Sequence, residues 1–121
     1  KLKGFWVYLD RVLPDAFMHV NIGPDDNRIC RLILRIDNEL KQVAPNLTFF
    51  PHPEQTPDSL LLQAVKNIAE CSKPHIANYP IHRDTFDQRG FGIVSCYNAL
   101  PQAGGANTLV RISLKRVAEQ F

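Results

Sequence analysis

The sequence predicts an α/β fold in which βαβ crossover units form a parallel sheet or a segment of a β/α barrel. Two observations lead to this fold class. Short runs with strand-like patterns alternate with stretches that have helical apolar spacing, and helices of this length suit crossovers between parallel strands. At 121 residues and 45% hydrophobic content, the chain has room for one compact core, so residues 1–121 are predicted to form one unit without a second domain.

The first half of the chain shows two helix–strand pairs. Residues 5–13 carry apolar side chains at helical spacing and stop before Pro14. Residues 16–22 alternate and are closed by Gly23-Pro24, which predicts a strand. An apolar stripe at intervals of three and four predicts a helix from Asp26 to about residue 43, and residues 47–50 (LTFF) predict a short strand.

The residues from Thr56 to Asp58 predict the start of the next helix. Thr56 is expected to cap it, Pro57 suits the first helical position and Asp58 complements the positive end of the helix dipole. Its apolar face runs to Lys73-Pro74. Residues 75–78 (HIAN) then predict a brief strand, and residues 79–89 a polar loop.

The last third of the chain is predicted to contain two more strands. Residues 91–95 form an apolar run, and a segment of turn-forming residues follows it to about residue 105. Residues 108–114 alternate again, and a terminal helix follows.

Composition excludes several classes of protein. A formal charge of +2, from 14 basic and 12 acidic residues that are well mixed, favours neither nucleic acid nor an anionic membrane as a partner. No run approaches the roughly 18 apolar residues of a membrane span, and residues 5–9 lack the flanks of a signal peptide. Three widely spaced cysteines without a CxxC pair indicate free thiols, so we expect a soluble cytoplasmic protein. Both ends look cut, which suggests a piece of a longer chain.

Cys96 lies where an apolar strand gives way to a glycine-rich turn. Functional groups of parallel α/β proteins gather at the carboxyl ends of strands, and Cys96 lies at such an end. Asn21 and Asn78 also lie at the carboxyl ends of predicted strands, so these residues are expected on one edge of the sheet. Together with Tyr97 and Asn98 beside the cysteine, they are the candidates for a substrate pocket.

The segments APNLTFFPHPEQTPDSLLLQAVKNIAECSKPHIAN and GFGIVSCYNALPQAGG resemble the glycyl radical enzymes, the group that contains pyruvate formate-lyase and the glycyl radical diol dehydratases. Both groups show a PN-L-T strand, a helix, a K-P-x-I strand and a G-x-G-I-x-x-C loop. Across essentially all 121 residues, including YLDRVLPDAFMHVNIGPDD and CSKPHIANYPIH, the sequence is similar to the YjjI-like branch of that family.

This resemblance implies a glycyl-radical-type, ten-stranded β/α barrel, of which this chain supplies a part that carries the cysteine loop (about residues 90–105). Cys96 matches the cysteine that becomes a thiyl radical and takes a hydrogen atom from a small organic substrate. No charged residue occurs from Gly90 to Val110, which suits a neutral thiol. The resemblance also implies a glycyl radical in a C-terminal part of the parent protein and a radical S-adenosylmethionine enzyme as activating partner.

The glycyl radical motif itself, arginine-valine-x-glycine-aromatic, does not occur in these 121 residues. The isolated fragment is therefore expected to be inactive, to bind no cofactor or metal and, with unpaired strand edges, to self-associate.

Two positions depart from the characterised branches. Asn98 stands where the dehydratases have a glutamate two residues after the cysteine, and an amide cannot act as a general base. Ser95 precedes Cys96, whereas pyruvate formate-lyase has two adjacent cysteines. The sequence therefore supports neither a diol dehydration nor a formate-lyase mechanism.

Other interpretations remain open from the residues alone. In one alternative, the chain is a free-standing α/β module that binds a ligand or partner. In another, it is a hydrolase or transferase in which Cys96 is a nucleophile and a histidine is its base. Cys30 and Cys71 lie on the apolar stripes of their helices and are expected to pack in the core. The spacing of Cys71, His75 and His82 fits no strong zinc pattern.

Overall fold

A computed structural model describes residues 1–13, 18–87, 89–94 and 98–102. The described elements are α1 (Leu2–Val12), β1 (His19–Ile22), α2 (Arg28–Leu40), β2 (Asn46–Phe49), α3 (Asp58–Cys71), β3 (His75–Ile76), α4 (Tyr79–Thr85), β4 (Phe91–Val94) and β5 (Asn98–Pro101). The predicted strand at 108–114, the terminal helix and the glycines of the 90–105 loop at 104 and 105 lie outside the described residues.

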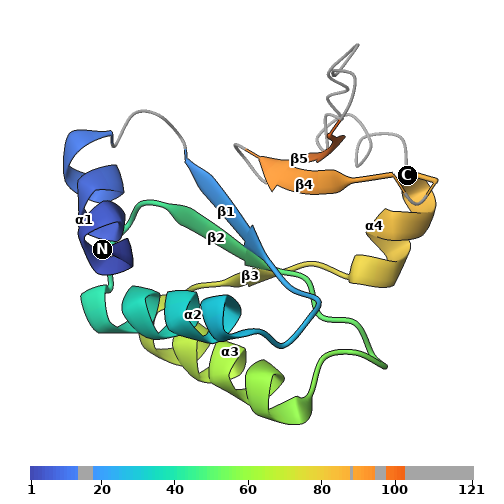
Figure 1. Cartoon of the computed structure of the whole chain (residues 1–121), viewed down its shortest axis with the longest axis horizontal. Coiled ribbons are helices and arrows are strands. Elements are labelled where there is room, and N and C mark those ends of the chain that lie inside the picture. The colour runs from blue at the N-terminus through green and yellow to red at the C-terminus, as the bar shows by residue number, and fades with distance from the viewer. Residues whose placement is uncertain (14–17, 88, 95–97, 103–121) are drawn as a thin grey trace, which may run out of the picture.

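Two successive βαβ units form the body of the molecule. β1, β2 and β3 pair in that order and in parallel, with α2 and α3 as the crossovers. Figure 1 shows α2 and α3 side by side on one face of this sheet, and β4 and β5 on the other side of it. The predicted α/β fold with parallel βαβ units is therefore confirmed, although the described strands do not close a barrel.

The core lies between the sheet and the helices. Alternate strand residues point to it, because successive side chains of a strand face opposite sides. Its fully buried members come from α1, β2 and both crossover helices and include Trp6, Leu34, Leu47, Phe49 and Leu60. Cys30 is buried in the same cluster, as predicted for a packing cysteine.

The two crossover helices begin in different ways. Asn27 caps α2, since its side-chain oxygen accepts hydrogen bonds from the backbone N–H groups of Ile29 and Cys30, both at 2.9 Å. The prediction that Thr56 caps α3 is wrong, because the Thr56 hydroxyl donates to the carbonyl of Pro24 (2.7 Å) and accepts from the backbone of His52 (2.9 Å). Thr56 thus joins the loops that follow β1 and β2.

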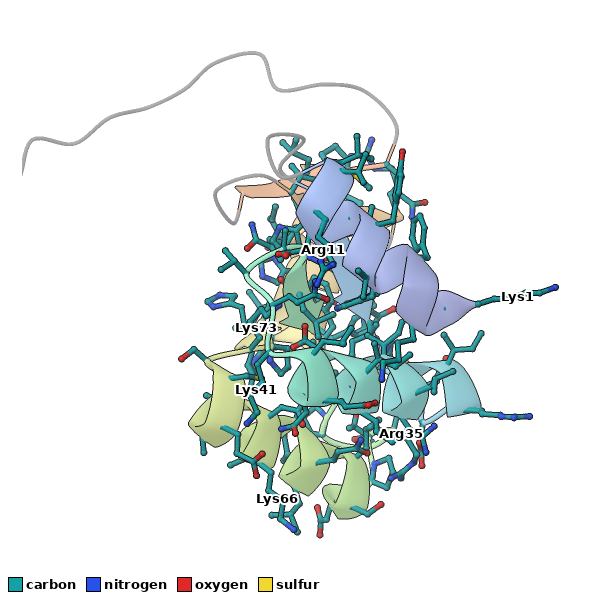
Figure 2. All side chains as sticks on the ribbon, turned by 90° about the vertical axis from the view of Figure 1, so that its left-hand side faces the viewer. Lys1, Arg11, Arg35, Lys41, Lys66 and Lys73 are labelled. Carbon is teal, nitrogen blue, oxygen red and sulfur yellow. The ribbon has the colours of Figure 1, made fainter. Side chains whose placement is uncertain are left out.

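A buried ion pair connects α2 to the start of β3. Lys73 Nζ lies 2.7 Å from Asp37 Oδ1 and 3.1 Å from the carbonyl oxygen of Pro45. Asp37 is fully buried and also accepts a hydrogen bond from the indole of Trp6 at 3.3 Å. Lys73 is labelled in Figure 2, where Arg35, Lys41 and Lys66 mark the outer side of the two crossover helices.

Two local predictions for residues 79–102 are wrong. Residues 79–85 are helical rather than a polar loop, because the Asn78 side chain accepts from the Ile81 N–H (3.1 Å) and Pro80 fits the first turn. Residues 98–101 form β5 rather than a turn, and they pair antiparallel with β4. The strand predicted at 91–95 is observed as β4, but it belongs to this second sheet instead of the parallel one.

No helix in the described part of the chain is long and apolar enough to cross a membrane.

Candidate functional site

The parallel sheet has two chemically different faces. Val20, Ile22, Leu47 and Phe49 point toward the crossover helices and form what we call the helix face. The alternate residues of these strands therefore point the other way and form the hairpin face, which includes His19, Asn21 and Thr48. In the register of the sheet, Asn21, Thr48 and His75 lie side by side across the three strands, so a polar row crosses this face.

His19 and Thr48 are coupled on the hairpin face. His19 Nε2 and Thr48 Oγ1 are 2.7 Å apart, which is hydrogen-bonding distance. Thr48 is fully buried, so its hydroxyl depends on a protein partner. This contact fixes the imidazole relative to the central strand.

Asn21 attaches the β4–β5 hairpin to this face. Its Nδ2 donates to the carbonyl of Ile93 and its Oδ1 accepts from the Ile93 N–H, both at 3.0 Å. The carboxamide thus pairs with the outer edge of β4 as a neighbouring strand would. Asn21 was expected to contact a substrate, but its amide is committed first to positioning this hairpin.

Aromatic contacts hold the base of the hairpin over the carboxyl ends of the parallel strands. The ring of Phe91 lies 5.4 Å from that of Phe50, which follows β2, and 5.6 Å from that of Tyr79, which follows β3. Ile93 is buried with Phe50 and Ala77 in a second apolar cluster. The hairpin is therefore attached through both side-chain packing and the Asn21 amide.

Cys96 and Tyr97 lie outside the described residues, as does Ser95. The strands on either side of them are described: Val94 ends β4, Asn98 begins β5, and these two residues pair. The distance of any histidine from the Cys96 sulfur is accordingly untested, and the role of Cys96 stays a prediction.

Two of the predicted pocket residues, Asn21 and Asn78, line different cavities. Asn21 lines a cavity of about 450 Å³ at the base of the hairpin, whereas the exposed Asn78 lines a separate cavity of about 420 Å³ beside His52. Arg83 and Arg89 also line the first cavity. Neither arginine was predicted from the sequence, because residues 79–89 were interpreted as a polar loop. The signal for a helix there was its start at Asn78-Tyr79-Pro80.

The histidines and Cys71 do not assemble into a metal site. Within the described ranges, no three His, Cys, Asp or Glu side chains are placed to hold an ion. His52 accepts the Glu54 N–H at Nδ1 (3.1 Å), and His82 packs edge-on against Phe50 at 5.9 Å. These contacts give His52 and His82 structural roles.

Comparison with known proteins defines the class of this protein. A family model described as "Glycyl radical enzyme YjjI-like" matches residues 1–121, the whole chain. The chain therefore belongs to the YjjI-like glycyl radical enzyme family. No solved structure matches it.

Two relatives give the scale of the match. The chain is 66% identical over 120 residues to YjjI of Escherichia coli K12, covering 99% of this chain and 23% of that protein. It is 39% identical over 118 residues to a protein of Haemophilus influenzae, covering 98% of this chain and again 23% of the relative. The chain thus spans about a quarter of the length of these curated relatives.

Proposed function

We propose that this chain is the segment of a glycyl radical enzyme that presents the hydrogen-abstracting thiol, Cys96, to a small organic substrate. The observation that carries the proposal is the placement of the β4–β5 hairpin. Its two strands flank the segment with Cys96, and Asn21 fastens β4 to the hairpin face of the sheet.

The position of the hairpin is consistent with the interior of a barrel. In β/α barrels the helices form the outer ring and the opposite face of the strands points inward. Here α2 and α3 cover the helix face, so the hairpin face is the one that would line the interior (Figure 1). The completed ten-stranded barrel would be formed with other parts of a longer protein.

The chemistry requires two hydrogen-atom transfers. A glycyl radical in another part of the protein takes the hydrogen atom from Cys96 Sγ, which gives an intact glycine and a thiyl radical. The thiyl then takes a hydrogen atom from a substrate C–H bond, which restores the thiol and leaves a carbon-centred substrate radical. A radical S-adenosylmethionine enzyme would generate the first radical, and the 121-residue segment alone would be inactive.

A Cys96→Ala variant of the full-length protein, activated without oxygen, tests this role. The variant keeps the glycine that stores the radical but lacks the relay to the substrate. We expect the glycyl radical signal in electron paramagnetic resonance to persist while turnover disappears. Cys30→Ala is the matched control: it removes a core sulfur, which lowers stability by about 1–2 kcal/mol, and leaves turnover per radical near wild type. Wild-type turnover per radical in Cys96→Ala would exclude the proposed role.

A further inference from the structure

The cavity at the base of the hairpin has the properties of a binding site for an organic anion. It measures about 450 Å³ and lies where the carboxyl ends of the parallel strands meet α4 and the first residues of β4. Ligands of α/β proteins bind at this edge of the sheet. We call it the arginine pocket, after Arg83 and Arg89 in its lining.

The charge of the arginine pocket is positive. Both arginines belong to its lining, which contains no aspartate or glutamate. Their partners are sequence neighbours outside the lining: Arg83 bonds Asp84 at 3.1 Å, and Arg89 bonds Asp87 at 3.3 Å. The two aspartate side chains are 66% and 81% exposed, and exposed pairs of this kind are worth only about 0–1 kcal/mol. A carboxylate in the pocket can therefore replace them at little cost.

One wall of the pocket is apolar and already assembled. The rings of Phe50, Tyr79 and Phe91 line it, and the centroids of Phe50 and Tyr79 lie 5.4 and 5.6 Å from that of Phe91. Such rings favour a ligand with an apolar body over a bare inorganic anion.

The polar side of the pocket is also fixed. The Gln102 N–H donates to the Gly90 carbonyl at 2.7 Å, and the Gln102 side chain occupies the space that a β-carbon on Gly90 would need. Gly23 has a φ of +96°, and a β-carbon there would lie 2.7 Å from the Phe50 carbonyl oxygen. Because glycine alone fits position 23 without strain, this part of the pocket is built into the backbone.

We propose that the arginine pocket binds the carboxylate of a small organic acid. The guanidinium groups of Arg83 and Arg89 pair with the carboxylate, and the three rings pack against the apolar part of the ligand. The pocket lies at Phe91, and β4 leads from there over about 10 Å to Val94, so this binding site stands independently of the proposed function.

Calorimetric titration of the full-length, unactivated protein tests the binding site. Benzoate is the probe, and benzamide is the neutral control of the same shape. We expect benzoate to bind at least tenfold more tightly than benzamide. The double variant Arg83→Gln/Arg89→Gln should weaken benzoate at least tenfold, because charge-assisted hydrogen bonds are lost. Arg28→Gln/Arg35→Gln removes two arginines that line a different hollow on α2 and should leave the affinity unchanged.

Three outcomes would overturn the proposal. They are equal binding of benzoate and benzamide, unchanged affinity in the Arg83/Arg89 variant with its thermal unfolding intact, and tighter binding of inorganic phosphate than of benzoate. Cys96→Ala separates this inference from the proposed function, since it should bind benzoate as the wild type does. If Cys96→Ala bound benzoate and kept full turnover, the proposed function would be wrong and the binding site would remain supported. If Cys96→Ala lost turnover but the wild type did not bind benzoate, only the binding site would be wrong.

Discussion

The helix face and the hairpin face belong to the same three strands, yet they are stabilised differently. Leu47 and Phe49 on the helix face are fully buried against α2 and α3 and need no polar partner. Thr48, between them in sequence, is just as buried but points the other way and bonds His19. Thr48 is therefore as buried as its apolar neighbours, although Asn21 and His75 on the hairpin face are exposed. The chemistry is apolar on one face and polar on the other.

This difference separates stability from positioning. Apolar burial is non-directional and tolerates small shifts, whereas the carboxamide of Asn21 contacts one backbone residue, Ile93, with a defined geometry. The helix face thus supplies most of the folding free energy. The hairpin face determines where β4 is held.

The largest expected effect on stability comes from the buried ion pair between Asp37 and Lys73. Asp37→Ala leaves the Lys73 ammonium buried without its counter-ion and the Trp6 indole without its acceptor. We expect a loss of about 3–5 kcal/mol of unfolding free energy for the 121-residue chain. Urea unfolding followed by circular dichroism measures it.

Glu39→Ala is the matched control for Asp37→Ala. Glu39 belongs to the same helix, and its carboxylate pairs with Lys3 on the exposed surface. An exposed pair of this kind is worth about 0–1 kcal/mol. Similar losses in the two variants would mean that the buried pair has no special weight.

The apolar pattern of the sequence was sufficient for the helix face. The spacing of apolar residues predicted α1, α2 and α3, because these helices are stabilised by burial along one stripe. Alternation closed by Gly23-Pro24 predicted β1, and the β-branched and aromatic content of residues 47–50 predicted β2. The ends were less accurate: α2 runs from Arg28 to Leu40, whereas Asp26 to about residue 43 was predicted. Asn27 supplies the cap.

The polar contacts between distant parts of the chain could be predicted only in part. The Asp37–Lys73 pair joins residues 36 positions apart, and the Asn21–Ile93 contact joins residues 72 apart, so no local pattern announces either. Thr56 has the chemistry of a helix cap but bonds the Pro24 carbonyl, which only the fold brings near. Asn21 was singled out for its position at the carboxyl end of a strand; its contact with β4 became visible only in three dimensions.

Removing the Asn21 amide should have a smaller and local effect on the hairpin face. Asn21→Ala leaves the N–H and carbonyl of Ile93 without these partners at a residue that is 3% exposed. The cost of about 1–3 kcal/mol corresponds to a roughly tenfold to hundredfold faster hydrogen exchange of the Ile93 amide. Exchange measured by nuclear magnetic resonance should show unchanged protection for Phe49 in β2.

Asn38→Ala is the control for the Asn21 variant, because the Asn38 amide bonds the exposed carboxylate of Glu70 instead of backbone. Exchange at Ile93 should be the same in Asn38→Ala as in the wild type. If Asn21→Ala accelerated Ile93 and Phe49 equally, the carboxamide would be a general stabiliser rather than a specific attachment of β4.

The smallest expected effect concerns Cys71, at the end of α3 beside the buried ion pair. Burial raises the pKa of the Cys71 thiol, and the Asp37 carboxylate, 3.8 Å from the sulfur, acts in the same direction. The folded chain therefore binds this proton more tightly than the unfolded chain. The resulting stability is present below the unfolded thiol pKa and is lost as the pH rises through the folded value.

Alkylation of Cys71 by iodoacetamide, followed peptide by peptide with mass spectrometry, measures this shift because only the thiolate reacts. The midpoint of the rate against pH should lie higher in the native chain than in the same chain unfolded in urea. The midpoint, unlike the absolute rate, is insensitive to the partial shielding of the sulfur. A native midpoint at or below the unfolded one would show that the Lys73 ammonium lowers the thiol pKa by more than burial and the Asp37 carboxylate raise it.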